Sequence, residues 1–247
     1  MTRPLLALLF LIAATPAAAG TLTLSPAVVP LGGRPGQSAQ QHLTVFNGTD
    51  QPMQFRIVAK DVLIRDGKRE FSAAGTHANS IAATAVFSAT TITVPANAEG
   101  AVDVTLTLPP QVTHRAVVIL FQGTVPGSRT NVAIGSLLTF ELTGHVSVRA
   151  DAVHATPPTD AANAEVTLAL ANDGSEPAVV RIVSAILTAK GTLVGKLPFE
   201  PRRLLPGEQS TVAAQYAGDL PAGDYRVITT LDVGRRTVTR TTALHVP

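Results

Sequence analysis

Hydrophobic and polar side chains alternate along much of the chain, most clearly in the segment 131–150, NVAIGSLLTFELTGHVSVRA. Most of its even-numbered positions are apolar, whereas its odd-numbered positions from 139 onward are polar or charged. Successive side chains of a β-strand point to opposite faces of a sheet, so this period of two predicts a strand with one apolar face. Gly144 is expected to break the strand, because a strand of this length, at about 3.3 Å per residue, would extend beyond a small sandwich.

Similar short segments recur between turns rich in Gly, Pro and Asn, and no segment has a convincing helical period. Strands are predicted near 21–30, 39–46, 53–64, 84–94, 101–108, 115–122 and 131–149, and near 164–171, 178–189, 193–199, 209–216, 224–233 and 236–246. Many short strands joined by turns are typical of immunoglobulin-like folds. The predicted fold class is therefore all-β, with two tandem immunoglobulin-like β-sandwich domains.

An internal repeat supports two similar units. FNGTDQPMQFRIV, from Phe46, resembles ANDGSEPAVVRIV, from Ala171, and one constant spacing relates the Asn, Pro and Arg residues of the two segments. THRAVVIL and DYRVITTL also match, at a shorter spacing, which indicates extra residues in the first unit near FSAAGTHANSIAAT. In the second unit Tyr225 stands where a tyrosine corner is expected, and His114 is its counterpart in the first unit.

The order of these features predicts the domain boundaries. Residues 1–19 carry one basic residue, a short apolar run and the triplet Ala17–Ala19, a pattern typical of a secretory signal peptide cleaved after Ala19. The first sandwich is expected over 20–152 and the second over 164–247. The segment between them, 153–163, contains two prolines and few apolar residues and is predicted to be the linker.

Composition and charge exclude several classes of protein. The chain has no cysteine, which excludes disulfides, thiolate metal sites and cysteine nucleophiles. The formal net charge is only +2 over 247 residues, too little for a nucleic-acid-binding surface. Apart from the leader, no run is long enough to span a membrane, so we expect no stable membrane insertion.

Motifs for catalysis and metal binding are missing. The six histidines are dispersed, and the chain contains neither a Gly-x-Ser-x-Gly elbow nor a phosphate-binding Gly-x-x-x-x-Gly-Lys loop. The NDGSE segment from Asn172 and the sequon at Asn47 are interpreted as turns. We therefore expect no catalytic residues, no metal and no cofactor, and a protein that is not an enzyme.

The layout resembles the periplasmic pilus assembly chaperone family, which has the PapD-like tandem fold. LSPAVVPL resembles the family's first strand, LTVFNGTDQPMQFRIVAKDVL its next hairpin and TITVPANAEGAVDVTL its proline-turn hairpin. HRAVVILFQGTVPG, followed by NVAIGSLLTFELTGHVSV, resembles the last two strands of its first domain. The resemblance implies a chaperone of pilus or fimbria biogenesis, located in the periplasm.

The resemblance also implies where a partner binds. Those chaperones complete a pilin-like subunit by strand addition, through alternate apolar residues of the last strand of domain one. The corresponding residues here are Val132, Ile134, Leu138, Phe140 and Leu142. The family also binds the subunit's terminal carboxylate with two basic residues, but 21–31 and 131–148 contain neither Lys nor Arg, so Arg34 and Arg115 are the candidates.

Two alternative interpretations also fit the sequence. The apolar stripe of 131–150 also fits ordinary core packing, with Phe140 and Leu142 directed inward and Val132 and Ile134 more accessible. The chain also fits a cell-envelope scaffold or adhesion module with tandem immunoglobulin-like domains, acting at the cell surface or outside the cell. The partner is then a cell-envelope component rather than a protein subunit.

Overall fold

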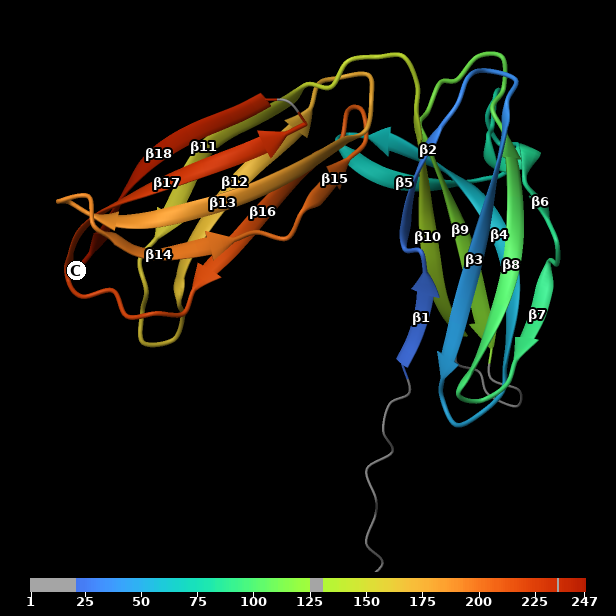
Figure 1. Cartoon of the computed structure of the whole chain (residues 1–247), viewed down its shortest axis with the longest axis horizontal. Helices are drawn as coiled ribbons and strands as arrows, with labels where there is room; N and C mark the ends of the chain where they lie inside the picture. The colour runs from blue at the N-terminus through green and yellow to red at the C-terminus, as the bar shows by residue number, and fades with distance from the viewer. Residues whose placement is uncertain (1–20, 125–130, 235) are drawn as a thin grey trace, which may run out of the picture.

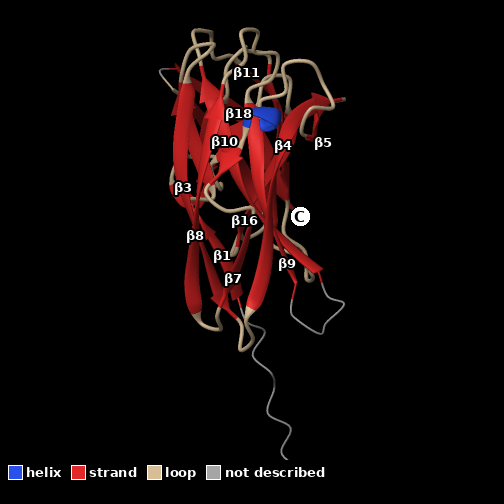
Figure 2. Ribbon diagram, turned by 90° about the vertical axis from the view of Figure 1, so that its right-hand side faces the viewer, coloured by secondary structure: helices blue, strands red, loops and turns tan. Residues whose placement is uncertain are grey.

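The structure is a computed structural model that describes residues 21–124, 131–234 and 236–247. Regular structure in these residues is almost entirely β-strand, with one short 3₁₀ segment, η1 (Ala82–Thr84) (Figure 2). No helix in these ranges is long and apolar enough to cross a membrane. The predicted signal peptide, 1–19, lies outside the described residues.

Strands β1 to β10 form the first sandwich. One sheet has the order β1 (Thr21–Ser25), β3 (Ser38–Gly48), β8 (Ala98–Thr107) and β6 (Val86–Phe87). The other has the order β2 (Val28–Gly32), β10 (Asn131–Glu141), β9 (Ala116–Thr124), β4 (Met53–Arg65) and β5 (Lys68–Ala73), with β7 (Thr91–Val94) also paired to β4. The chain changes sheets between β1 and β2, and β2 pairs with β10 in the parallel sense.

Strands β11 to β18 form the second sandwich. Its smaller sheet has the order β11 (Val148–Thr156), β12 (Ala164–Asn172) and β16 (Gln209–Tyr216). Its larger sheet has the order β14 (Leu193–Pro198), β13 (Ala178–Thr188), β17 (Gly223–Val233) and β18 (Arg236–Val246), with β15 (Arg202–Leu204) also paired to β13. The predicted fold class, two tandem all-β sandwiches, is confirmed.

Alternating side chains from both sheets fill each core. In the first sandwich Leu43 and Val45 of β3 are fully buried together with Phe55 of β4 and Phe121 of β9. The rings of Phe55 and Phe121 meet edge to face, with centroids 6.3 Å apart. In the second sandwich the core lies between β12 and the pair β13 and β17. The period of two in the sequence therefore corresponds to inward and outward positions of real strands.

The predicted linker at 153–163 is wrong. Residues Val153–Thr156 belong to β11, which pairs with β12 inside the second sandwich, and 157–163 form the hairpin loop between these two strands. The chain crosses from one sandwich to the other at 142–147 instead, between β10 and β11. Gly144 lies in this crossing segment, and β10 ends at Glu141, as the predicted break requires. The two prolines therefore mark a turn within the second sandwich rather than a boundary.

The internal repeat is visible in two equivalent turns. The Asn47 side-chain amide donates to the carbonyl oxygens of Gln51 (2.8 Å) and Val94 (3.1 Å). At the equivalent position, the Asn172 amide donates to Glu176 O (2.8 Å) and Leu204 O (3.1 Å). Both asparagines are fully buried, and the segments after them, 49–52 and 173–177, connect consecutive strands, as the predicted turns require. In the second unit the hydroxyl of Tyr225 donates to Pro221 O over 2.7 Å and forms the predicted tyrosine corner.

The two sandwiches meet at one end of the first and give the molecule a bent, two-lobed shape (Figure 1). Leu205, between β15 and β16, is 2% exposed and packs against Val62, Val118 and Leu137 of the first sandwich. The backbone N–H of Gln209 donates to Gly67 O over 2.8 Å. A pocket lined by residues of both sandwiches lies next to this contact.

Candidate functional site

Strand β10 has two halves with different surroundings. Along Asn131–Thr139 it pairs with β9, and along Leu137–Glu141 it also pairs with β2 on its other side. Within the described part of the chain, no strand pairs with 131–136 on the side away from β9. This stretch is therefore an unpaired sheet edge, whereas the second half of the same strand is paired on both sides.

The open edge has a defined end. The hydroxyl of Ser136 donates to Pro26 O over 2.7 Å, and the Leu137 N–H donates to Ala27 O over 2.9 Å. Both acceptors lie in the segment that carries the chain from β1 to β2. This segment closes the edge at Ser136, and the open stretch is thus limited to about six residues.

The backbone groups that face the open side follow from strand geometry. The N–H and C=O of a strand residue point to one side, and those of the next residue point to the other. Phe140 donates its N–H toward β9, to Arg115 O over 2.7 Å, whereas Leu137 donates toward the β2 side. By this alternation, Asn131, Ala133 and Gly135 direct their N–H and C=O groups away from β9. The edge therefore offers three residues for pairing with an incoming strand.

Side-chain burial divides the five predicted contact residues. Val132 and Ile134 are partly buried at the open edge and pack against the core of the first sandwich. Leu138 and Phe140 are 0% exposed, so the prediction that they contact a partner is wrong. Leu142 is partly buried and lies beyond the strand, where its N–H donates to Glu176 Oε2 over 2.8 Å. The accessible part of the stripe is thus Val132 and Ile134.

Charge distinguishes this edge from several others. Edge strands that are exposed to pairing with another chain are commonly protected by charged side chains. Strands β5, β11, β14 and β18 each carry charged residues, and β18 carries Arg236 and Arg240. The open stretch 131–136 carries no charge, and the same holds for β1 and β16. A protein strand could therefore pair with 131–136 without burying an unpaired charge.

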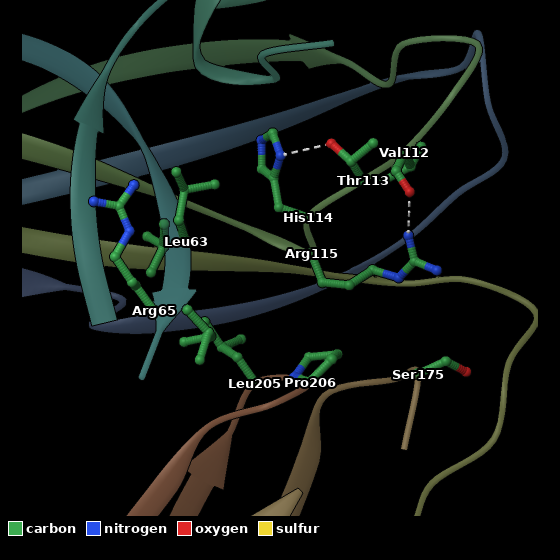
Figure 3. Close-up of a pocket in the computed structure, with 11 residues that line it drawn as sticks. Leu63, Arg65, Val112, Thr113, His114, Arg115, Ser175, Leu205 and Pro206 are labelled. Carbon is green, nitrogen blue, oxygen red and sulfur yellow. Dashed lines mark hydrogen bonds between the residues drawn. The ribbon is translucent and has the colours of Figure 1, made fainter. Parts of the chain in front are cut away.

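A pocket of about 470 Å³ lies where the two sandwiches meet (Figure 3). Val62, Thr113, His114 and Arg115 line it from the first sandwich, and Ser175, Leu205 and Pro206 line it from the second. The Arg115 guanidinium donates to Val112 O over 3.1 Å, and its Nε lies 3.7 Å from Glu176 Oε1. Neither Arg115 Nε nor Glu176 Oε1 has a hydrogen-bond partner, although both atoms are buried. The guanidinium is thus only partly engaged.

The structure does not bring Arg34 into this pocket. Arg34 is exposed in the turn after β2, where its backbone N–H donates to Gln37 Oε1 over 3.0 Å. Its side chain makes no hydrogen bond or ion pair with the described residues. Of the two predicted carboxylate-binding residues, only Arg115 therefore lies in a pocket.

His114 has a different role from that of Tyr225. Its Nε2 lies 2.8 Å from Oδ1 of Asp61, a fully buried residue of β4 that also accepts hydrogen bonds from Ser80 Oγ and the Ala82 N–H. Burial alone raises the pKa of the Asp61 carboxyl, but the hydrogen bonds from His114, Ser80 and Ala82 outweigh this effect and hold the pKa below its usual value. The expected corner is therefore replaced by a buried polar cluster.

This cluster does not have the geometry of a nucleophilic triad. In such a triad the histidine lies between the hydroxyl and the carboxylate. Here Asp61 lies between Ser80 and His114, so the histidine does not contact the hydroxyl that it would have to activate. Within the described residues, no group of three or more His, Asp or Glu side chains is arranged to hold a metal ion.

Several residues that connect the sandwiches were not predicted from the sequence. Arg69 donates to Glu208 Oε2 over 2.9 Å and to Arg203 O over 2.7 Å. Arg203 in turn donates to Thr139 Oγ1 over 3.1 Å. Glu176 accepts from the crossing segment and faces Arg115. No local pattern identifies these pairs, because their members lie far apart in the sequence.

Comparison with known proteins gives similarities of structure alone. No protein-family model matches the chain, and no curated protein matches it. The class 5 fimbriae chaperone CfaA is 13% identical, with 92% of this chain and 100% of that chain covered and a TM-score of 0.47. The E. coli chaperone DraB is 16% identical, with 92% and 97% covered and a TM-score of 0.41.

A third similar structure is the CsuC–CsuE chaperone–tip adhesion subunit pre-assembly complex from the archaic chaperone-usher Csu pili of Acinetobacter baumannii. It is 10% identical, with 90% of this chain and 97% of that chain covered and a TM-score of 0.44. The resemblance to pilus chaperones expected from the sequence is thus also found among solved structures. All three TM-scores lie below 0.5, and none of these similarities defines the function of the chain.

Proposed function

We propose that the chain is an exported, non-catalytic assembly chaperone that binds a partner subunit by β-strand addition, in pilus or fimbria biogenesis. The observation that carries this proposal is the open, uncharged edge of β10 at 131–136. Main-chain hydrogen bonds supply affinity in this mode of binding, and alternate side chains supply specificity. An incoming strand would pair with Asn131, Ala133 and Gly135 and would cover Val132 and Ile134.

The surroundings of the edge support this mode of binding. Val132 and Ile134 lie at the margin of the first core, and Leu22 of β1 is also partly buried against that core. Apolar side chains of an incoming strand would extend the existing core and would bury these residues further. Each fully buried aliphatic side chain contributes about 1.5–3 kcal/mol. The edge can therefore recognise alternation of apolar residues in the partner.

Arg115 is the residue that we propose for binding a carboxylate of the partner. It lies in the pocket between the sandwiches, and within the described residues its guanidinium donates one hydrogen bond, to Val112 O. A carboxylate placed there would accept a charge-assisted hydrogen bond, which contributes more than a neutral one. Arg34 lies outside the pocket and has no role in the proposal.

The test compares Ile134→Lys with a matched control, Val86→Lys. Val86 is 67% exposed and lies on β6, an edge of the other sheet. A photo-crosslinking residue at Ala133 in the wild type and in each variant would then report binding in the cell envelope of the source organism. We expect one stoichiometric subunit that lacks a strand of its own sandwich to be captured by the wild type and by Val86→Lys, but not by Ile134→Lys.

Two results would contradict the proposal. Equal capture by both variants would show that the partner does not use the open edge of β10. Capture of a glycan or peptidoglycan instead of a protein subunit would favour the cell-envelope scaffold. Thermal melts of both variants show whether any loss of binding is caused by unfolding.

A further inference from the structure

We propose that two copies of this chain pair through β16 of the second sandwich, in an antiparallel ladder whose two-fold axis passes through Ala213. The three-stranded sheets of the two copies would then join into one continuous sheet. This surface lies on the other sandwich from the open edge of β10, so the inference goes beyond the proposed function and does not depend on it.

The two edges of the three-stranded sheet differ in their protection. Edge strands are commonly protected against pairing by charged side chains, by proline or by a β-bulge. Strand β11, at one edge, carries Arg149 and Asp151 and has a register shift between Ala150 and Val153. Strand β16, at the other edge, has the sequence QSTVAAQY, without charge or proline, and pairs with β12 in one continuous register. Of these two edges, β16 is therefore the one that suits pairing with another strand.

Backbone hydrogen bonds show which groups of β16 face away from β12. Just before the strand, Glu208 O accepts a hydrogen bond from the Asn172 N–H on the β12 side over 2.9 Å. The N–H of the next residue, Gln209, donates in the opposite direction, to Gly67 O of the first sandwich over 2.8 Å. Successive residues of a strand alternate in direction, so every second residue from Gln209 onward directs its N–H and C=O away from β12.

The free part of this edge has two defined ends. At the start of β16, the first sandwich occupies the edge through the bond between Gln209 and Gly67. At the end of β16, Tyr216 packs toward β14, where its hydroxyl donates to Val194 O over 3.3 Å. The outward-facing residues between these ends are Thr211, Ala213 and Gln215. Within the described part of the chain, no strand pairs with them on this side.

The spacing of the outward-facing residues determines the register. In an antiparallel pair, residues that exchange two hydrogen bonds both direct their N–H and C=O groups toward the neighbouring strand. When β16 pairs with its own copy, Ala213 therefore lies opposite Ala213, and Thr211 lies opposite Gln215. The ladder covers residues 211–215, which is the whole free part of the edge. It ends on each side before Gln209, where the first sandwich already occupies the edge.

The side chains fit together in this register. On the face toward the core, Val212 lies opposite Ala214 of the second copy, and Ser210 lies opposite Tyr216 of the second copy. A larger side chain thus meets a smaller one at each of these positions. On the outer face the opposed side chains are small or uncharged, and threonine can form a hydrogen bond with glutamine across the strands. No charge is buried, and no two large side chains are opposed.

The sequence of β16 has the pattern that its own edge requires. A strand that pairs here has to place small or apolar side chains beside Val212 and Ala214, and uncharged polar ones on the exposed outer face. Strand β16 of a second copy meets both requirements, and the formal net charge of only +2 means that two copies repel each other weakly. Five residues from each copy make a small interface, typical of weak and transient association. We therefore expect a dimer that dissociates on dilution.

The test exploits the two-fold axis at Ala213, which is exposed. A charge at this position would meet its own copy, so Ala213→Lys and Ala213→Glu should each weaken the dimer, by about fivefold at the upper range for like charges on opposed strands. An equimolar mixture of the two variants should restore dimer formation as a heterodimer. Ala243→Lys is the matched control, because Ala243 is an exposed alanine on β18, an edge strand of the same sandwich that carries Arg236 and Arg240.

Sedimentation velocity of the full exported chain over a concentration series would measure the dissociation constants. We expect the wild type and Ala243→Lys to dimerise equally. Opposed hydrogen-bonded residues have Cα atoms about 5.5 Å apart, within the range of a disulfide. Because the chain has no cysteine, Ala213→Cys should oxidise to a covalent dimer, whereas Ala243→Cys and Ala133→Cys should not.

Three results would overturn the inference. A wild type that stays monomeric up to about 100 µM would exclude the dimer by mass action. A dimer that Ala213→Lys leaves unchanged, or that the mixture does not restore, would exclude this register. A covalent dimer of Ala133→Cys in place of Ala213→Cys would show that the copies pair through β10 rather than β16.

Discussion

Replacing Phe140 and Ile134 by glutamate, one at a time, would separate the enclosed half of β10 from its open half. The two side chains lie on the same face of one strand, but Phe140 is 0% exposed and Ile134 is partly buried at the margin of the core. The same carboxylate therefore enters two different environments. If β10 has an open edge at 131–136, the two variants should differ strongly in stability.

The structure allows the magnitudes to be worked out. Removing a buried phenyl ring costs about 3–5 kcal/mol, and burying an unpaired carboxyl group adds further cost. This sum approaches the total stability of a typical domain, about 5–15 kcal/mol, so Phe140→Glu should fail to fold or should melt at a much lower temperature. At Ile134 the carboxylate can reach solvent, and only part of an aliphatic burial term of about 1.5–3 kcal/mol is lost. We expect a loss of about 1–2 kcal/mol there.

Urea unfolding followed by circular dichroism would measure both free energies of unfolding. If Phe140→Glu does not fold, Phe140→Leu provides a milder variant at the same site, and Ala133→Glu serves as a surface control, with a change within about 0.5 kcal/mol. Equal large losses at Phe140 and Ile134 would refute the reasoning, because both residues would then be core and the edge would not be accessible. A stable Phe140→Glu protein would refute the assignment of Phe140 to the core.

Three further predictions concern the rest of the molecule. Asp61→Asn should lose about 2–4 kcal/mol in urea unfolding, because it disrupts a buried hydrogen-bonded carboxylate. The pKa of the Asp61 carboxyl is lowered from its usual value of 3.8. The ionised carboxylate therefore contributes its full share to the free energy of unfolding above pH 3.8, and this share is lost as the pH falls through the lower folded-state pKa. In this range the free energy of unfolding should change less with pH in Asp61→Asn than in the wild type. Arg69→Met removes the 2.9 Å ion pair of Glu208, which is 2% exposed, and leaves only the longer contact of its carboxylate with Arg202 (3.8 Å). The substitution should cost about 1–3 kcal/mol and increase cleavage of the segment 142–147 in limited proteolysis. A chelator should leave the melting temperature unchanged, since the chain has no cysteine and its described residues contain no metal-binding cluster.

Much of the fold could be predicted because the strands have one buried face. The segments predicted at 53–64 and 178–189 correspond to β4 (Met53–Arg65) and β13 (Ala178–Thr188). In these strands the alternation is regular and turn residues follow it. Local sequence therefore determined both the existence and the approximate ends of the strands.

The boundary between the sandwiches could not be placed in the same way. Strand β11 contains a register shift between Ala150 and Val153, so its inward positions do not follow one period of two. The alternation of the preceding segment also continues to Ala150, past the end of β10. Without a break in the pattern, the two prolines at 157 and 158 were the strongest local signal, and they mark a hairpin loop.

The buried polar pairs near the junction of the two sandwiches form between residues far apart in the sequence, so no local sequence pattern predicts them. Asp61 and His114 lie 53 positions apart, and Arg69 and Glu208 lie 139 apart. An isolated acidic residue in a strand usually lies on a solvated face, so the sequence gives no reason to expect that Asp61 is fully buried. Such pairs become visible only when the strands have been assembled.

The open edge of β10 illustrates a more general limit of hydrophobic patterning. Alternation shows which side chains point toward a core, and Val132, Ile134, Leu138 and Phe140 all belong to one such stripe. The edge, however, is a property of the backbone, whose hydrogen bonds lie in the plane of the sheet and perpendicular to the side chains. Whether a neighbour is present depends on where the segment after β1 crosses to the other sheet, and Ser136 fixes that point through its bond to Pro26 O. One strand can therefore stabilise the fold along one half and leave the other half free to pair, because its side chains pack against the core, whereas its backbone forms hydrogen bonds with adjacent strands.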